Sequence, residues 1–361
     1  MKTISDTIER LSRYRSNPSG RASQPSELKK REDRGRNPGQ LTGWYKTPKD
    51  PENHPALVVV LHGCTQTAAG YDHGSGWSRL ADDYGFAVLF PEQSRQNNAN
   101  LCFNWFQADD VTRDRGDVLS IREMVDGMIT ECGIDPKRVY VTGLSAGGAM
   151  ANALLATYPD VFAGGAIIAG LPFGAASTVP EAFDRMRGHG LPSPTALDNA
   201  VRTASQHKGP WPTVSIWHGT TDTTVVEANA RAIIEQWCGV HGVGARANTT
   251  QVVDGQALET WKDASGRDVI EHYRISGMGH GTPLDTRTGY GHSAPYMLDV
   301  GISSTVHIAR SWGLTPSFER RAALDSSDAA HSSSAEQSRP VGQGGIQDVI
   351  ERALRSAGLM K

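Results

Sequence analysis

The alternation of short apolar runs with helix-length segments between residues 57 and 312 constrains the fold more than any other feature of the sequence. The run 57–61 is a continuous stretch of Leu and Val, which is typical of a strand buried on both faces of a sheet. The other strands are expected at 86–90, 139–141, 162–168, 214–217 and 269–275, and the helices at 75–84, 117–132, 147–158, 227–238 and 305–312. This alternation predicts an α/β fold with a mostly parallel sheet and helices on both faces.

Local rules also set two boundaries in this pattern. Pro91 is expected to end the second strand, and Asp117 is expected to be the N-cap of the long helix 117–132. In open parallel sheets, ligands bind beyond the carboxyl ends of the strands. The residues that directly follow each strand are therefore the first candidates for chemistry.

The charge balance and the lengths of the apolar runs exclude two classes of partner. The chain has 36 Lys and Arg against 39 Asp and Glu, a net charge of −3, which gives no whole-protein electrostatic case for nucleic acid. The longest aliphatic run, 56–61, is far too short to span a membrane. The N-terminal residues contain no apolar core of a signal peptide, so a cytoplasmic location is expected.

The two ends of the chain differ in composition from its middle. Residues 1–40 carry ten Lys and Arg against five Asp and Glu, and residues 325–345 are rich in Ser, Gly and Gln. Each end also has a short pattern with Ile at positions i and i+4, which is one narrow apolar stripe on a helix. We expect an N-terminal helix with a basic flexible segment (1–40), a central domain (41–316), and a linker with a short amphipathic helix (317–361). The terminal helices are expected to dock on the domain or on each other.

A candidate nucleophile lies directly after the strand 139–141. Ser145 is the centre of a G-x-S-x-G pattern that begins at Gly143 and ends at Gly147, between a strand and an Ala-rich helix. The glycines are needed because the turn is so sharp that neighbouring side chains would collide, while the serine hydroxyl is exposed. The pattern alone is weak, and its position between a strand and a helix is what supports it.

A serine nucleophile needs a base and an acid that orients the base. In folds with this strand–serine–helix turn, the acid and then the histidine follow later strands. Asp222 follows the strand 214–217, and His280 follows the strand 269–275, both in glycine-containing loops. The competing acids are Asp198, Asp254 and Asp263, and the competing histidines are His218, His272 and His292. His292 is the alternative base, whereas His218 is interpreted as structural.

Two backbone N–H groups are expected to bind the oxyanion of an ester intermediate. One belongs to Ala146, the residue after the serine. The other belongs to Cys64 or Thr65, in the loop after the first buried strand. The four cysteines are too few for a disulfide scaffold and are not spaced as a zinc site, so free thiols are expected, with one bridge as the alternative.

Four stretches of sequence together resemble one enzyme family. Residues 61–66, 102–105, 115–118 and 138–150 look like the poly(3-hydroxybutyrate) depolymerase family of esterases, which is related to feruloyl and acetylxylan esterases. The resemblance covers about residues 41–316. It implies an α/β-hydrolase fold, ester hydrolysis without metal or cofactor, and a triad of Ser145, Asp222 and His280. Secreted members often bridge the first-loop cysteine to a downstream one, which here matches Cys64 and Cys102, so a secreted location is the alternative.

The substrate is expected to contact an insertion between the fourth and fifth strands. This lid-like segment, at about 171–212, contains Phe173 and Trp211, and Trp105 is a further candidate wall. Aromatic walls suit apolar acyl groups, although each of these residues is equally well interpreted as core. The favoured substrates are hydroxyalkanoate polyesters, their oligomers or short-chain esters. Plant cell-wall feruloyl or acetyl esters are the alternative substrates. The alternative of another class is a non-catalytic, granule-associated scaffold protein that binds granules or self-associates through its terminal helices.

Overall fold

The computed structural model describes residues 27–32, 35–49 and 54–315. Its strands are β1 (Lys29–Lys30), β2 (Thr42–Lys46), β3 (Leu57–Leu61), β4 (Ala87–Glu92), β5 (Val139–Leu144), β6 (Gly164–Ile168), β7 (Thr213–Gly219), β8 (Thr249–Val253), β9 (Gln256–Lys262), β10 (Asp268–Ile275), β11 (Thr282–Leu284) and β12 (Met297–Asp299). Its helices are α2 (Ala68–Ser75), α3 (Trp77–Tyr84), α4 (Ala108–Val111), α5 (Gly116–Cys132), α6 (Ala146–Thr157), α7 (Val179–Met186), α8 (Pro194–Thr203), α9 (Ala228–His241), the 3-10 helix η1 (Thr286–Thr288) and α10 (Ser304–Ser311).

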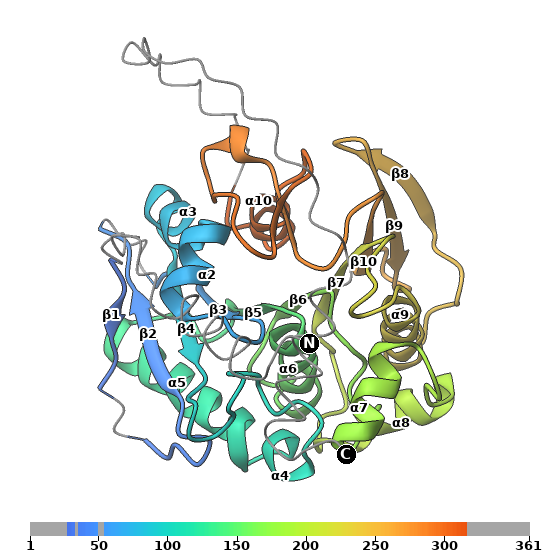
Figure 1. The fold of residues 1–361 in the computed structure, drawn as a ribbon, viewed down its shortest axis with the longest axis horizontal. Coiled ribbons are helices and arrows are strands. Elements are labelled where there is room, and N and C mark those ends of the chain that lie inside the picture. Colours follow the sequence, from blue (N-terminus) through green and yellow to red (C-terminus); the bar gives the residue numbers. More distant parts are fainter. Residues whose placement is uncertain (1–26, 33–34, 50–53, 316–361) are drawn as a thin grey trace, which may run out of the picture.

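Ten strands form one sheet in the order β1-β2-β4-β3-β5-β6-β7-β10-β9-β8 (Figure 1). The six central strands, from β4 to β10, pair in parallel. The two strands at each edge are antiparallel. The prediction of a mostly parallel sheet is therefore confirmed, and the carboxyl ends of six strands meet at one edge.

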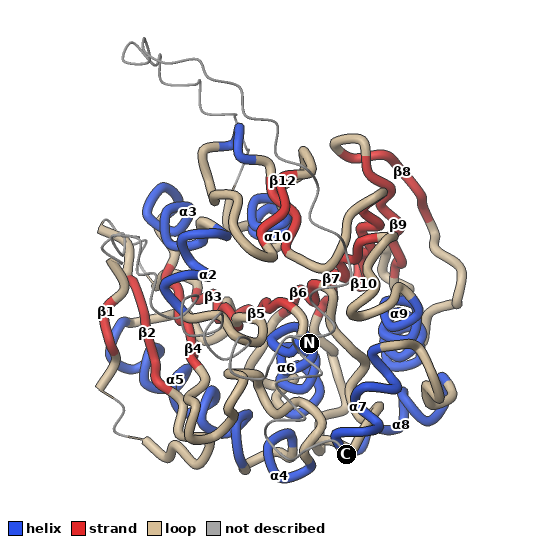
Figure 2. The backbone as a smooth tube through the Cα atoms, in the orientation of Figure 1, coloured by secondary structure: helices blue, strands red, loops and turns tan. Residues whose placement is uncertain are grey.

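Helices cover both faces of this sheet. Figure 2 shows the central strands as a band with α2, α3 and α10 on one side and α5, α6 and α9 on the other. The side chains of β3 alternate between two core clusters, with Leu57, Val59 and Leu61 in one cluster and Val58 and Val60 in the other. The continuous apolar run of β3 is explained by this burial on both sides, because successive residues of a strand face opposite layers.

Three local expectations need correction. The strand β4 does not stop before Pro91, which lies opposite Gly43 of β2, but continues through it to Glu92. The helix expected at 75–84 is found as α3 but begins at Trp77, because Gly76 takes a left-handed conformation (φ 75°) and separates it from α2, a helix that the sequence patterns do not predict. Asp117 is not the N-cap of α5, since it lies inside the first turn and is wholly buried.

Part of the expected flexible N-terminal segment is packed on the domain. β1 pairs with β2, and the Arg31 guanidinium, which is buried, forms an ion pair of 3.0 Å with Glu131 of α5. The sheet therefore begins before residue 41, and the ion pair of Arg31, which follows β1, ties this edge of the sheet to α5. The two terminal helices expected from the sequence lie outside the described residues.

The insertion between β6 and β7 contains two short helices, α7 and α8, which the sequence patterns do not predict. Thr178 and Ser193 cap them through their hydroxyl groups, and each helix has proline in its first turn. Leu197 of α8 packs with Ala232 of α9 in a small separate cluster. Whether this insertion covers the site as a lid stays a prediction. Within the described part of the chain, no helix combines the length and apolar character that crossing a membrane requires.

Candidate active site

Ser145 lies at the turn from β5 to α6 in strained backbone geometry, with φ 58° and ψ −118°. A positive φ is rare for a residue with a side chain, and strain of this kind is concentrated at functional sites. Its N–H donates to the carbonyl of Ile168 on β6 (2.9 Å), which helps to hold the turn. The serine is thus presented at the carboxyl end of the central sheet.

The glycines beside Ser145 are required by close backbone contacts. A methyl group on Gly147 would lie 2.4 Å from the carbonyl oxygen of Leu61 and 2.5 Å from that of His62. A methyl group on Gly143 would lie 2.4 Å from the backbone of Gly147. Real side chains do not approach this closely, so the turn and the loop after β3 can pack together only with glycine at these positions.

Asp222 and His280 are joined by a hydrogen bond of 2.7 Å from Nδ1 to Oδ2, so the structure brings together the predicted acid and base. The Asp222 side chain is buried, and its other oxygen accepts from the backbone N–H groups of Thr224 and Val225, both at 2.9 Å. A carboxylate can only accept, so Nδ1 of His280 carries the proton and Nε2 remains available as a base.

The loops that carry this pair are fastened to each other. The N–H of Thr220 donates to Ile275, and that of Thr221 donates to Met278, both at 3.0 Å. A methyl group on Gly219 would lie 2.2 Å from the carbonyl oxygen of Met278. The end of β7 and the segment before His280 therefore make direct backbone contact. This contact fixes the spacing between the predicted acid, Asp222, and the predicted base, His280.

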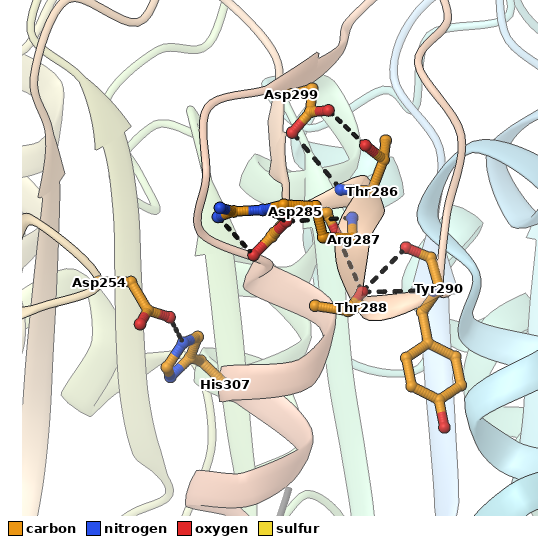
Figure 3. A network of polar contacts seen from close by, with 8 residues as sticks. All are labelled: Asp254, Asp285, Thr286, Arg287, Thr288, Tyr290, Asp299 and His307. Atoms are coloured by element: carbon orange, nitrogen blue, oxygen red, sulfur yellow. Dashed lines mark hydrogen bonds and ion pairs between the residues drawn. The ribbon is translucent and has the colours of Figure 1, made fainter. Parts of the chain in front are cut away.

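The competing carboxylates have other partners. Asp254 accepts from Nε2 of His307 on α10 at 2.8 Å (Figure 3). Asp198 pairs with Arg202, one turn later on α8. Asp263 accepts hydrogen bonds within its own turn.

The competing histidines are also engaged elsewhere. His292 stacks on His73, with ring centres 4.3 Å apart. His272 lies on β10 with Nδ1 3.1 Å from Glu259. His218 is buried, and its Nε2 lies 2.7 Å from the Val225 carbonyl.

The segment after His280 is organised by a separate polar network (Figure 3). Arg287 donates to both carboxylate oxygens of Asp285, at 2.7 and 3.0 Å. The hydroxyl of Thr288 donates to the Asp285 carbonyl, and Thr286 donates to Asp299 of β12. These contacts hold the conformation of the excursion, the loop of residues 285–296 between β11 and β12.

Tyr296 is a neighbour of His280 that the sequence analysis missed. Its ring lies edge-to-face with the imidazole, with ring centres 6.2 Å apart. Its carbonyl accepts from the N–H of Thr282, which brings it beside residues that directly follow His280. It has a left-handed conformation (φ 64°) outside any regular periodicity, so no sequence pattern could have indicated it.

The loop after β3 offers the predicted backbone donors. The Thr65 N–H is already bonded to the Asn100 carbonyl at 2.7 Å, which leaves Cys64 as the better of the two candidates. Cys64 forms a disulfide with Cys102, as the resemblance implies. Ala146 is the first residue of α6, where backbone N–H groups have no partner within the helix.

His62 holds the loop after β3 in place through hydrogen bonds of its two ring nitrogens. Its Nε2 accepts from the Gln93 N–H (3.1 Å), so its Nδ1 carries the proton and donates to the Gly63 carbonyl (2.7 Å). Burial lowers the pKa of His62 to about 4, so the ring is neutral at ordinary pH.

Asp117, expected as a helix cap, is instead the centre of a buried polar cluster. It accepts from the side chains of Gln93 and Asn97 and from the backbone of Asn104, each at 3.1 Å. Burial, with a smaller contribution from Asp110, raises the pKa of Asp117 to about 7. The cluster connects α5 to the segment that carries Cys102 and to Gln93, the partner of His62.

The three predicted substrate-wall residues belong to one core cluster or pack against it. Trp105 is 8% exposed and lies edge-to-face with Phe106, while Trp211 is 9% exposed and contacts His207. Phe173 is half-buried, and its backbone is bonded on both sides to the Gln236 side chain. Their burial fits the core interpretation as well as the wall interpretation. In the described ranges, no group of three or more His, Cys, Asp or Glu side chains is arranged to hold a metal ion.

Comparisons with known proteins agree with this geometry. Residues 43–257 match the family described as esterase PHB depolymerase. The chain is 44% identical over 284 residues to poly(3-hydroxyalkanoate) depolymerase C of Paucimonas lemoignei, covering 78% of this chain and 68% of that protein. It is 33% identical over 256 residues to an acetylxylan esterase of Coprinopsis cinerea, covering 69% of this chain and 67% of the other.

A solved structure supports the same assignment. The acetyl xylan esterase from Aspergillus awamori superposes with a TM-score of 0.68 at 25% identity, covering 80% of this chain and 99% of that one. The expected α/β-hydrolase fold is thereby confirmed. Because the family match spans more than half of the sequence, the chain belongs to the esterase PHB depolymerase family, and it is a carboxylic ester hydrolase.

Proposed function

We propose that the protein hydrolyses hydroxyalkanoate esters, as polyester, oligomers or short-chain esters, through a triad of Ser145, His280 and Asp222. The observation that carries the proposal is the Asp222–His280 hydrogen bond, which leaves Nε2 of His280 free at the sheet edge where Ser145 is held in a strained turn. The substrate class rests on similarity to poly(3-hydroxyalkanoate) depolymerase C at 44% identity.

The reaction follows from the proton positions. Nε2 of His280 takes the proton of the Ser145 hydroxyl as the oxygen attacks the ester carbonyl, and Asp222 stabilises the resulting imidazolium. The N–H groups of Ala146 and Cys64 bind the oxyanion of the tetrahedral intermediate. His280 then gives its proton to the departing alcohol, which leaves an acyl-enzyme. Water, deprotonated by the same nitrogen, attacks the acyl group. The bond to the Ser145 oxygen then breaks as His280 returns the proton to that oxygen, which releases the acid and restores the enzyme.

Acyl-enzyme formation is tested with a serine-reactive fluorophosphonate. We expect mass spectrometry to find one adduct, on Ser145, and Ser145→Ala to keep the fold but lose labelling and hydrolysis. Adduct on another serine, or full hydrolysis by Ser145→Ala, would contradict the nucleophile. A stable, unlabelled wild-type protein without hydrolysis would instead favour the non-catalytic scaffold.

The substrate class is tested separately with a panel of esters. A 3-hydroxybutyrate trimer, p-nitrophenyl esters of graded chain length, methyl ferulate and acetylated xylan are compared by kcat/KM. We expect the trimer and the short acyl esters to be the best substrates. Preference for acetylated xylan or methyl ferulate would favour the alternative, which is supported by the similarity to the acetyl xylan esterase fold.

Trp105, Phe173 and Trp211 are proposed to contact the acyl or alcohol part of the substrate. Substitution by Ala at a true contact should raise KM more for the trimer than for p-nitrophenyl acetate, because the larger substrate covers more of the wall. Equal effects on both substrates, together with a lower melting temperature, would assign that residue to the core.

The cellular location is proposed from the disulfide. A bridge between Cys64 and Cys102 persists in oxidising compartments and is reduced in the cytoplasm. We therefore propose the secreted alternative. Linked Cys64 and Cys102 peptides should be found when the protein is taken from its native host with free thiols blocked at lysis, and two blocked thiols would contradict this.

A further inference from the structure

His218 is a buried histidine whose hydrogen bonding is incomplete. It lies one residue before the end of β7, and its side chain has no exposed surface. Its Nε2 lies 2.7 Å from the Val225 carbonyl. A carbonyl only accepts, so Nε2 carries the proton. The other nitrogen, Nδ1, has no hydrogen-bond partner within the described part of the chain. A buried polar atom without a partner is costly, and the cost implies that the imidazole has a use that an apolar side chain could not serve.

Val225 connects His218 to Asp222. Its N–H donates to Oδ1 of Asp222 at 2.9 Å, and its carbonyl accepts from His218. One peptide segment is therefore held at both of its polar groups, by the acid on one side and by the histidine on the other. Nε2 of His218 also lies 3.7 Å from Oδ2 of Asp222, the oxygen that accepts from His280. Two histidines thus lie near the same carboxylate oxygen, with His280 within hydrogen-bond distance and His218 farther away.

The neutral state of His218 preserves this division of roles. Burial is the main influence and lowers the pKa of His218, while the nearby charge of Asp222 acts in the opposite direction and His272 and His280 act with burial. A second cation at this position would compete with His280 for the carboxylate. A neutral N–H donor instead fixes the loop and leaves the charge of Asp222 to the imidazolium that forms on His280.

We infer that His218 is a positioning residue, which sets the orientation of the Asp222 carboxylate toward His280 through the backbone of Val225. This inference rests on the proposed triad. Loss of the His218 donor should let the 222–225 turn relax, which weakens the Asp222–His280 hydrogen bond without touching the substrate. The effect should therefore appear in kcat and in the pH profile rather than in KM.

The test compares His218→Leu and His218→Phe, which lack the donor, with His218→Gln, whose amide can replace Nε2–H. We expect the first two to lower kcat about 10- to 100-fold, because a small displacement of a catalytic group costs roughly this much, with KM little changed. The acid side of the kcat/KM profile should move to lower pH, because the imidazolium of His280 loses part of its charge stabilisation. His218→Gln should recover most of kcat and the wild-type profile.

His272→Leu is the matched control. His272 lies on the adjacent strand, is similarly buried and also has one nitrogen without a partner, but its Nδ1 contacts Glu259 rather than the triad loop. It should lower the melting temperature without moving the pH profile. If His218→Leu and His272→Leu change activity and stability alike, His218 is only structural and the inference fails.

A double variant separates this inference from the proposed function. If His218 acts through Asp222, then His218→Leu with Asp222→Asn should be no slower than Asp222→Asn alone. Independent, multiplying losses would overturn the positioning role. A nearly wild-type Asp222→Asn would overturn the triad itself, whereas an inactive Asp222→Asn beside a folded His218→Phe with wild-type kcat and pH profile would overturn only the role of His218.

Discussion

Nδ1 of His280 lies 2.7 Å from Oδ2 of Asp222, although 58 residues separate them in the sequence. Asp254 and His307 make a second aspartate–histidine contact, of 2.8 Å, between the β8–β9 turn and α10. The two contacts have similar lengths, but they use different ring nitrogens, Nδ1 of His280 and Nε2 of His307. Their surroundings also differ, because the Asp222 side chain is fully buried and that of Asp254 is 45% exposed. Asp254 therefore provides an internal control for the proposed acid of the triad.

Asp222→Asn should lower kcat by about 10⁴-fold, because an amide favours the wrong tautomer of His280. Asp254→Asn should stay near wild-type activity. Both variants are compared in a soluble-ester assay, with circular dichroism to confirm folding. An inactive Asp254→Asn beside an active Asp222→Asn would reverse the assignment.

Gly147→Ala should disrupt the Ser145 turn. The added methyl would lie 2.4 Å from the Leu61 carbonyl oxygen, so the turn and the β3 loop must separate. We expect a loss of about 1–3 kcal/mol in the free energy of unfolding together with loss of activity. Gly244→Ala is the control, since a methyl there meets no atom within 4 Å. Urea unfolding and kcat/KM of both variants check this, and an active, stable Gly147→Ala would show that the backbone contact is not needed.

His62 should make stability depend on pH. Its pKa is about 4 in the folded protein against 6.5 when unfolded, so between these values the unfolded chain binds the extra proton. The contribution is therefore fully present above pH 6.5 and is lost as the pH falls toward 4, by about 1.4 kcal/mol per pH unit.

His62→Gln should remove this slope, because glutamine keeps an acceptor for the Gln93 N–H but does not titrate. The pKa values of Asp117 and Glu271, each raised to about 7 chiefly by burial, act in the opposite direction in both proteins and cancel in the comparison. The measurement is the difference in free energy of unfolding between wild type and variant at pH 7, 6, 5 and 4. A constant difference would contradict the burial argument.

Replacing both Cys64 and Cys102 by Ser should destabilise the protein by about 2–4 kcal/mol, since the bridge closes a chain segment of 38 residues. Hydrolysis should fall as well, because the proposed oxyanion donor at Cys64 loses its anchor. Cys132→Ser is the control, since Cys132 is a free thiol. Melting curves and kcat of the two variants are compared. An unchanged kcat in the double variant would show that the disulfide is not needed to position the proposed oxyanion donor.

Deleting residues 1–26 and 325–361 should leave hydrolysis of a small soluble ester nearly unchanged, because no candidate site residue lies in either segment. Binding to insoluble polyester granules, or self-association, should decrease if the Ile stripes of these segments mediate contact. Soluble-ester kinetics, granule sedimentation and light scattering test this. Loss of soluble-ester activity together with a lower melting temperature would assign the segments to the fold.

The parts of the site that the sequence could predict are those set by contiguous residues. The turn around Ser145 is a local pattern with a steric cause, and Asp222 and His280 each directly follow a recognisable strand. The core strands were predictable because their signal is also contiguous in the sequence. β3, for example, is an unbroken apolar run because it is buried on both faces.

The parts that could not be predicted depend on contacts between distant loops. Asp117 has the sequence context of a helix cap, and only the fold brings Gln93, Asn97 and Asn104 around it. The edge strand β8 is exposed along most of its length and shows no alternation of buried and exposed residues, so periodicity gave no signal. Tyr296 lies beside His280 because β11 pairs with β12, a pairing of two three-residue strands.

The backbone contact between Gly147 and the carbonyls of Leu61 and His62 also bears on how enzymes of this scaffold diversify. The atoms nearest to a methyl group on Gly147 all belong to the main chain of Leu61 and His62, so at this contact between the serine turn and the loop of the proposed oxyanion donor there is no side chain whose size could be varied to tune their separation. Changes of substrate must then arise in segments that surround this joint, such as the insertion with α7 and α8 or the excursion with Tyr296. This backbone contact thus ties the proposed nucleophile to the proposed oxyanion donor, and it leaves the surrounding segments as the places where selectivity can vary.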